Sequence, residues 1–380
     1  MKRRHLIFYA FVRPLVIAFT KLRFGFRYKK AENLPEKYIV LSNHLTDYDL
    51  LFLAASFKRQ MYFVGSEHIA RWKIYWLLKY AFEPIMRHKG APATAAIMDI
   101  LRKVRQGANV CMFAEGVRSW DGVTCPIQPA TAKLIKTAGC GLVTYRLTGG
   151  YFASPMWSGA SVRRGEVYGE PVRVFTADEI KALSADEIYE IIVTDLYEDA
   201  YARQLKDPKP YRGKNLAVGL ENVLFRCPEC DGIDTFSSSG NTVSCKNCGM
   251  TLQYDIYGML DSSKFPTVKA LADWQKQKVQ RDIEAGISYT AENCILKLIQ
   301  KHEETILLQG AVIMTAEALQ CGDMVFPMAQ IADLAMHGQR TMVFTIDGKY
   351  YELRVGAGFN ALKFMQYYNG CKEKQKAAII

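Results

Sequence analysis

His44 and Asp49 are the side chains whose types and spacing best suit acid–base chemistry. They lie in a segment that reads Asn43-His44-Leu45-Thr46-Asp47-Tyr48-Asp49. An imidazole can take the proton of a hydroxyl as that hydroxyl attacks an activated acyl group, and a neighbouring carboxylate fixes its tautomer and stabilises the imidazolium. A thioester needs no covalent enzyme nucleophile for this reaction. A single His near a single Asp is also typical of a hydrogen-bonded turn, so the surrounding residues must decide between the two.

The spacing of this pair restricts where it can lie. Two residues five apart on one helix differ by about 140° around its axis and do not face each other. We therefore expect His44 to precede a helix and Asp49 to lie in its first turns. The apolar run 38–42 predicts a strand that ends directly before the pair, and residues 50–56 predict the helix.

A second group of polar residues follows the strand predicted at residues 110–113. It reads Phe113-Ala114-Glu115-Gly116-Val117-Arg118-Ser119. Arg118 offers a planar fork of donors that suits a phosphate, and Gly116 allows the backbone to approach one closely. A shorter segment between the two groups ends in another arginine and reads Glu83-Pro84-Ile85-Met86-Arg87.

These two groups resemble the signature blocks of the glycerolipid acyltransferase family, the 1-acylglycerol-3-phosphate acyltransferases, over about residues 31–205. The resemblance implies that His44 is the general base and Asp49 its orienting carboxylate. It implies that the acceptor's glycerol phosphate is bound by Arg87, Glu115, Gly116 and Arg118. We therefore expect a 1-acyl-sn-glycerol-3-phosphate O-acyltransferase-like enzyme, which transfers a fatty acyl group from acyl-CoA or acyl carrier protein to the free hydroxyl of a lysophospholipid.

Two departures from the family pattern concern the acceptor's head group more than the chemistry. Ala114 and Val117 stand where the family usually has Pro and Thr, and residues 142–146 stand where a Pro flanked by aliphatic residues is often found. Two alternatives stay open: an acyltransferase for a different lysolipid or glycerol phosphate acceptor, and a catalytically inactive lipid-binding membrane scaffold. The intact His44 and Asp49 favour the enzyme.

Four of the ten cysteines form two Cys-x-x-Cys pairs separated by 14 residues. They are Cys227, Cys230, Cys245 and Cys248. Tetrahedral zinc accepts four thiolates, so the spacing predicts a zinc ribbon over residues 222–254, with a structural Zn2+ that has no open coordination position. A redox dithiol pair is the competing interpretation. The other cysteines are scattered, and we expect no disulfide framework in a chain without a secretory signal.

The alternation of strand and helix patterns predicts an α/β domain over residues 31–205, with a central mixed sheet flanked by helices and the site at the strand ends. Residues 185–205 are expected to form one long helix. The prolines and charges of residues 206–221 indicate a linker.

The C-terminal part is predicted to be mainly β. Residues 255–300 are expected to provide a helical connection, with a helix at 268–283, and the first strand. Further strands are predicted at 305–308, 311–315, 324–328, 341–346 and 350–355, with a helix at 360–368. This set, over residues 301–375, resembles a small pleckstrin-homology-like (PH-like) barrel, a type that often binds lipid head groups or peptides. A docking or oligomerisation module without a ligand is equally open.

Residues 1–30 hold nine Lys/Arg and no Asp/Glu, and they carry most of the chain's net charge of +11. Arg13 and Pro14 divide the apolar run, so neither a membrane-spanning helix nor a secretory signal is expected. We expect a basic amphipathic segment at an anionic membrane surface, on its cytoplasmic face, with the protein peripheral or monotopic. A basic helix docked on its own domain is the alternative. The mixed charges near the cysteines give no reason to expect a nucleic-acid partner.

Overall fold

The computed structural model describes residues 2–66, 69, 73, 75–87, 93–159, 161–300, 303–331 and 334–377. The chain divides into two compact units. The first comprises Met1–His88, Ala93–Met156 and Ala160–Gly213, and the second comprises Lys89–Pro92, Trp157–Gly159 and Lys214–Ile380. The division at Gly213 lies within the predicted linker, residues 206–221. The predicted zinc ribbon, helical connection and barrel fall together in the second unit.

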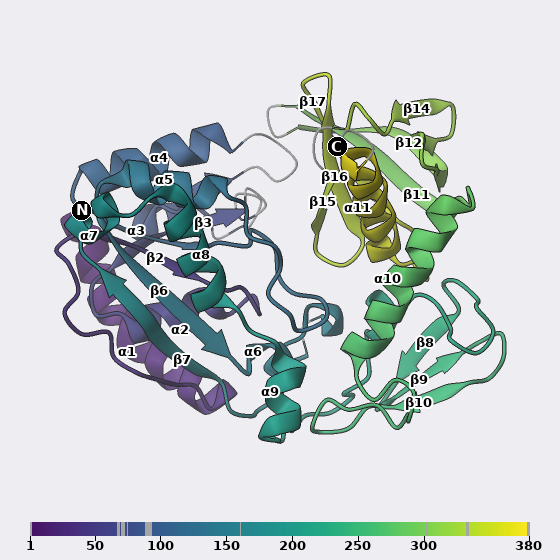
Figure 1. The fold of residues 1–380 in the computed structure, drawn as a ribbon, viewed down its shortest axis with the longest axis horizontal. Helices are drawn as coiled ribbons and strands as arrows, with labels where there is room; N and C mark the ends of the chain where they lie inside the picture. Colours follow the sequence, from purple (N-terminus) through teal and green to yellow (C-terminus); the bar gives the residue numbers. More distant parts are fainter. Residues whose placement is uncertain are drawn as a thin grey trace. The chain divides into compact units, whose positions relative to one another are not determined.

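The first unit is built on a seven-stranded mixed sheet in the order β1-β7-β6-β2-β5-β3-β4 (Figure 1). Its strands are β1 Arg27–Tyr28, β2 Tyr38–Ser42, β3 Met61–Ser66, β4 Ile85–Arg87, β5 Asn109–Phe113, β6 Gly141–Thr148 and β7 Tyr168–Phe175. All neighbours pair parallel except β6 and β7. Ser42 pairs with Phe113 in the register of β2 and β5, so both strands end at the same edge of the sheet.

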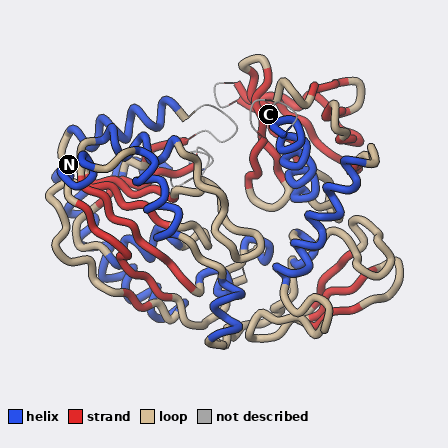
Figure 2. Tube along the Cα trace, in the orientation of Figure 1, coloured by secondary structure: helices blue, strands red, loops and turns tan. Residues whose placement is uncertain are grey.

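Helices cover both faces of this sheet (Figure 2). They are α1 Arg3–Phe24, α2 Asp49–Ser56, α3 Tyr75–Phe82, α4 Thr94–Arg105, α5 Ala130–Ala138, α6 Gly150–Ala153, α7 Ala177–Ala182, α8 Ala185–Leu196 and α9 Ala200–Lys206. The helices α4, α5 and α8 bury one apolar face against Ile39 and Leu41 of β2. The alternate residue Tyr38 faces Phe57 after α2 on the other side, as the two-residue period of a strand requires. The expected α/β domain with a mixed sheet is confirmed.

The single long helix expected at residues 185–205 is wrong. The chain breaks between α8 and α9 because Thr124 binds the backbone of Glu198: its N–H donates to Glu198 O over 2.9 Å, and Glu198 N donates to Thr124 Oγ1 over 2.8 Å. Asp199 then caps α9 by accepting from Ala202 N over 2.9 Å. These long-range contacts override a sequence that favours helix throughout.

The N-terminal helix α1 docks on α2 of its own unit. Tyr9 donates to the carbonyls of Ala54 and Phe57 over 2.8 and 2.7 Å, and Arg13 donates to those of Ala55 and Phe57 over 2.8 and 2.9 Å. These carbonyls belong to the end of α2, where a helix leaves its last acceptors without internal partners. Arg13 therefore caps a neighbouring helix through its side chain, a role that its basic character alone does not reveal.

One apolar face of α1 nevertheless stays exposed. Phe11, Leu15 and Leu22 are 76%, 70% and 71% exposed. Among the described residues, α1 is the one helix long and apolar enough to cross a membrane, judged by length and composition.

The second unit is mainly β. A three-stranded sheet, ordered β10-β9-β8, precedes the helix α10 and a seven-stranded antiparallel sheet, ordered β14-β13-β12-β11-β17-β16-β15. The elements are β8 Phe236–Ser239, β9 Thr242–Cys245, β10 Thr251–Gln253, α10 Val268–Glu284, β11 Tyr289–Gln300, β12 Glu303–Met314, β13 Ala318–Cys321, β14 Met324–Pro327, β15 Leu334–His337, β16 Thr341–Ile346, β17 Lys349–Arg354 and α11 Ala361–Ala377.

Several predicted boundaries in this unit need correction. The two strands expected at 305–308 and 311–315 are one strand, β12, because Gly310 continues its pairing with β11. The sequence patterns missed β13 and β15, and α11 extends well beyond residue 368. A two-residue hairpin turn follows β16: Asp347 and Gly348 both have positive φ, as this type of turn requires.

Buried polar contacts join the three-stranded sheet region to both helices of the second unit. Gln275 of α10 accepts from the backbone of Phe225 and Arg226 over 2.7 and 2.9 Å. Lys363 of α11 forms an ion pair with Asp234, and their side chains are only 2% and 8% exposed. A buried pair of this kind requires both partners, since either charge alone is costly to bury.

Candidate active site

His44 and Asp49 lie as their spacing predicts, on either side of the start of α2. His44 follows β2, Asp49 is the first residue of α2, and the atoms His44 Nδ1 and Asp49 Oδ2 are 2.9 Å apart. Asp49 is fully buried and also accepts from Leu45 N, Thr46 N and Thr46 Oγ1 over 2.6, 2.9 and 2.9 Å. A carboxylate accepts only, so it selects the tautomer with a proton on Nδ1 and leaves Nε2 free to take one.

The rest of His44 is held on three sides. Its ring stacks on that of Phe113, with centroids 4.1 Å apart and planes 9° from parallel. Its backbone N–H donates to Glu115 Oε1 over 2.7 Å, and its carbonyl accepts from Ser119 N over 3.3 Å. The side chain remains 21% exposed. The imidazole is thus fixed in position yet open to a reacting group.

Asn43 anchors the same loop to the centre of the sheet. Its side-chain amide donates to Leu147 O and accepts from Leu147 N, each over 2.8 Å. This two-bond contact with β6 joins residues 104 positions apart and is buried. The loop that carries His44 is therefore tied to β6 before it and to α2 after it, which restricts the motion of the imidazole.

Glu115 is placed differently from what the resemblance implies. It is 8% exposed, and its two carboxylate oxygens accept from the backbone N–H groups of His44 and Cys125. Burial raises its pKa to about 8. Both oxygens of the buried side chain are occupied by main-chain donors, so Glu115 holds the backbone of His44 in place.

Gly116 and Arg87 are in close contact. Gly116 has a φ of +69°, and a Cβ added there would lie 2.6 Å from Arg87 Nη1. A side chain at this position would displace the guanidinium, which is a physical reason for glycine. Arg87 ends β4, and its buried Nε has no hydrogen-bond partner among the described residues. A buried donor without a partner is uncommon in a protein and needs an explanation, such as a bound water, ion or ligand.

Arg118 reaches back to the loop of His44. Its Nη1 lies 2.9 Å from Asp47 Oδ2, and the two side chains are 15% and 72% exposed. The structure thus gathers His44, Asp49 and Glu115 directly, brings Arg87 against Gly116, and connects Arg118 to the loop of His44 through Asp47. Sequence reasoning missed the roles of Asn43, Thr46, Phe113 and Ser119. A Thr-x-x-Asp spacing from Thr46 to Asp49, a helix-capping signature, could have revealed Thr46.

Residues 25–148 match the family model described as Acyltransferase. This chain carries an acyltransferase domain. The matched residues include His44, Asp49, Arg87, Glu115 and Arg118. The prediction of an acyltransferase enzyme is confirmed at this level.

Among solved structures, the 1-acyl-sn-glycerophosphate (LPA) acyltransferase PlsC from Thermotoga maritima is similar to the chain at 18% identity. The match covers 52% of this chain and 81% of that one, with a TM-score of 0.42. No curated protein matches this chain.

Outside the acyltransferase domain, the four paired cysteines form one cluster. Their sulfur atoms all lie within 4.8 Å of one another. The Sγ atoms of Cys227 and Cys248 are 3.7 Å apart, as are those of Cys230 and Cys245. Four sulfurs about 2.3 Å from a tetrahedral zinc ion lie about 3.8 Å from each other, whereas a disulfide needs about 2.05 Å. The cluster fits a tetrahedral metal and not a disulfide.

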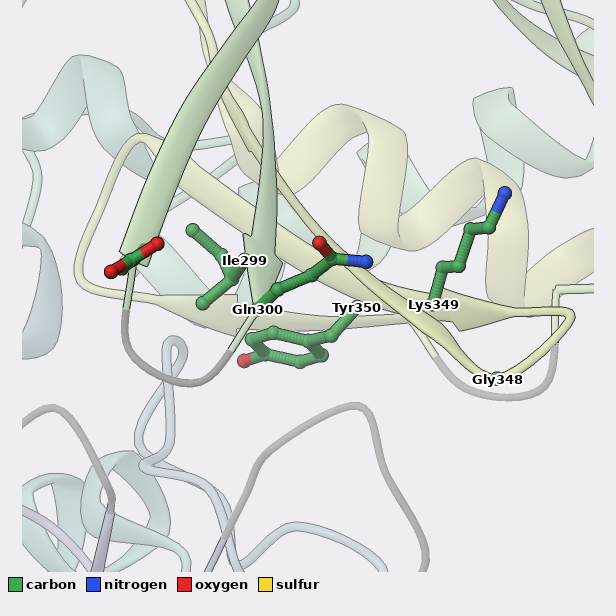
Figure 3. A pocket seen from close by; sticks show the side chains of 6 residues that line it. Ile299, Gln300, Gly348, Lys349 and Tyr350 are labelled. Atoms are coloured by element: carbon green, nitrogen blue, oxygen red, sulfur yellow. The ribbon is translucent and has the colours of Figure 1, made fainter.

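An open hollow of about 750 Å³ lies at one end of the seven-stranded antiparallel sheet of the second unit (Figure 3). It is lined by Ile299, Gln300, Glu303, Gly348, Lys349 and Tyr350. Figure 3 shows that the Lys349 side chain extends away from Gln300 and Tyr350. None of the predicted site residues lines this hollow, and its polar groups do not converge on one point.

Proposed function

We propose that the acyltransferase domain transfers a fatty acyl group from a thioester to the free hydroxyl of a lysophospholipid, as a 1-acyl-sn-glycerol-3-phosphate O-acyltransferase-like enzyme. The observation that carries this proposal is the immobilised His44. Its Nδ1 faces Asp49 at 2.9 Å, its ring lies on Phe113, and its backbone is bound on both sides, so Nε2 is the atom left to accept a proton.

The reaction follows from this arrangement. Nε2 of His44 takes the hydroxyl proton while the acceptor oxygen attacks the thioester carbonyl, and Asp49 stabilises the imidazolium that forms. The new C–O bond forms and the C–S bond breaks. The imidazolium then returns the proton to the leaving thiolate, so His44 is neutral again at the end of each turnover. The donor is acyl-CoA or acyl carrier protein.

We assign the acceptor's phosphate to Arg87 and Arg118. The unpartnered buried Nε of Arg87 supports this assignment, because a guanidinium binds phosphate oxygens through parallel N–H groups. Gly116 contributes by letting Arg87 approach the main chain. Lysophosphatidate is the first candidate acceptor, and another lysolipid or glycerol phosphate is the alternative.

We further propose that α1 and α3 place the domain on the cytoplasmic face of an anionic membrane as a peripheral or monotopic protein. The exposed apolar residues of α1 support this, and α3 adds Trp76, Leu77 and Tyr80, which are 70%, 41% and 48% exposed. Phe8 of α1 contacts Tyr80 edge to face, with centroids 5.9 Å apart, so the two apolar faces adjoin. Exposed patches of this kind are typical of membrane contacts.

For the second unit we propose a structural zinc ion bound by Cys227, Cys230, Cys245 and Cys248, and a PH-like barrel. The 3.7 Å sulfur separations support the zinc ribbon. Seven antiparallel strands closed by α11 support the barrel. Metal analysis of the purified protein should return about one zinc per chain, and Cys227→Ser should lose it. A full-length protein without metal would contradict the ribbon.

The acyl-transfer proposal is tested with purified full-length protein, a panel of lysolipids, and acyl-CoA and acyl-carrier-protein donors. Products are identified by mass spectrometry. We expect acylated lysophospholipid from the wild type and a loss of about a hundredfold or more in His44→Ala, since base catalysis alone contributes that much. His337→Ala, in the second unit, is the matched control and should keep full activity. Absence of product, or activity that survives in His44→Ala, would refute the proposal.

A further inference from the structure

Asp47 is a carboxylate inside the region assigned to the acceptor's phosphate. Its Oδ2 lies 2.9 Å from Arg118 Nη1, the distance at which a phosphate oxygen would bind the same guanidinium. Arg118 has this one ionic contact among the described residues, and its side chain is only 15% exposed. In the free protein, therefore, an internal anion occupies the position that the acceptor's anion requires.

Asp47 cannot leave this region by moving its backbone. Tyr48 N donates to Thr46 Oγ1 over 2.9 Å, and Thr46 donates from both N and Oγ1 to Asp49 over 2.9 Å. These bonds fix the chain on either side of Asp47. Its side chain is 72% exposed and free to rotate, so it can release Arg118 while its charge stays close to any phosphate that takes its place.

The negative charge that Asp47 keeps near the site repels a phosphate group more strongly when that group carries more negative charge. A phosphate monoester carries between one and two negative charges near pH 7 and approaches two at pH 8, because its second pKa is about 6. A phosphodiester carries one. Coulomb repulsion from Asp47 scales with that charge, so the monoester is repelled more strongly.

We propose that Asp47 is a specificity-determining residue of the acceptor site. It holds Arg118 in the free enzyme, is displaced by the acceptor's phosphate, and lowers the preference for phosphate monoesters relative to diesters. This inference rests on the proposed function, because it takes Arg118 as a ligand of the acceptor's phosphate.

The test measures binding of two soluble head groups, sn-glycerol 3-phosphate as the monoester and sn-glycero-3-phosphoglycerol as the diester. Titration calorimetry at pH 8 and low salt compares the full-length wild type with Asp47→Asn. We expect Asp47→Asn to lower the Kd of the monoester about fourfold and that of the diester about twofold, in proportion to their charge. Raising the salt to about 1 M should reduce both effects, since the Debye length falls to about 3 Å.

Two further variants separate the outcomes. Asp99→Asn removes an exposed carboxylate on α4 that pairs with Arg102, so it matches the change in net charge and should alter neither Kd. Arg118→Ala should weaken binding of both head groups. Unchanged Kd values in Asp47→Asn, together with weaker binding in Arg118→Ala, would overturn this inference alone. Unchanged Kd values in Arg118→Ala would overturn the assignment of the phosphate site.

Discussion

Glu115→Gln distinguishes support of His44 from direct contact with the acceptor. In the native structure the two Glu115 oxygens accept from His44 N and Cys125 N. Glutamine has only one acceptor oxygen at its end. One of the two backbone N–H groups would therefore face the side-chain NH2 group, which cannot accept its hydrogen bond. The variant therefore loses one hydrogen bond and leaves a buried donor without a partner.

The size of the effect follows from these two losses. A hydrogen bond between neutral groups contributes about 0.5–1.5 kcal/mol, and an unsatisfied buried donor costs about 1–3 kcal/mol. The losses overlap, so we expect the free energy of unfolding to fall by about 1–3 kcal/mol. Because Glu115 fixes the backbone of His44, a displacement of about 1 Å would lower kcat about a hundredfold. KM for the acceptor should change little.

Steady-state kinetics and urea denaturation provide the measurements. Asp195→Asn is the matched control, since Asp195 is another buried carboxylate with satisfied bonds, to Arg173 and Thr144, and it does not contact His44. It should lose stability and keep kcat. If Glu115→Gln instead raises KM and leaves kcat intact, Glu115 contacts the acceptor and the support role is wrong.

The same residue predicts a pH dependence of stability. Burial raises the pKa of Glu115 from 4.5 to about 8, so between these values the native protein holds a proton that the unfolded chain has lost. The contribution of Glu115 to stability therefore decreases as pH rises through this window. Urea denaturation at pH 5 and pH 8 measures how much the free energy of unfolding falls between these pH values. This fall should be smaller in Glu115→Gln than in the wild type, and an equal fall would contradict the assignment.

Three further results are expected. Asp49→Asn should lower kcat by about a hundredfold or more with little change in KM, measured by steady-state kinetics, because the amide no longer stabilises the imidazolium. Lys363→Met should lower the unfolding free energy of the second unit by about 3–5 kcal/mol in urea, since Asp234 stays buried without its partner, and adding Asp234→Asn should recover most of that loss. Chelation of zinc should reduce hydrogen-exchange protection in α10, whose Gln275 binds the chain leading to Cys227, while the strands of the first unit keep theirs.

The local part of the site could be predicted because it depends on short spacings. A strand ending before His44 and a helix over residues 50–56, with Asp49 at its start, follow from apolar periodicity and from the five-residue separation. The two Cys-x-x-Cys pairs likewise place four sulfur atoms in one cluster. In each case the residues that act together are close in the chain, so their types and spacing nearly determine their geometry.

The tertiary structure decided which partner each polar side chain takes. Glu115 lies 71 residues from His44, and only the register of β2 against β5 brings its carboxylate to that backbone N–H. From the sequence, Arg13 is expected to be a surface charge. In the structure it binds carbonyl groups at the end of α2, because α1 docks there. Sequence determines which groups can donate and accept. Packing determines which of them meet, because each buried polar group needs a partner, and that partner often lies far along the chain.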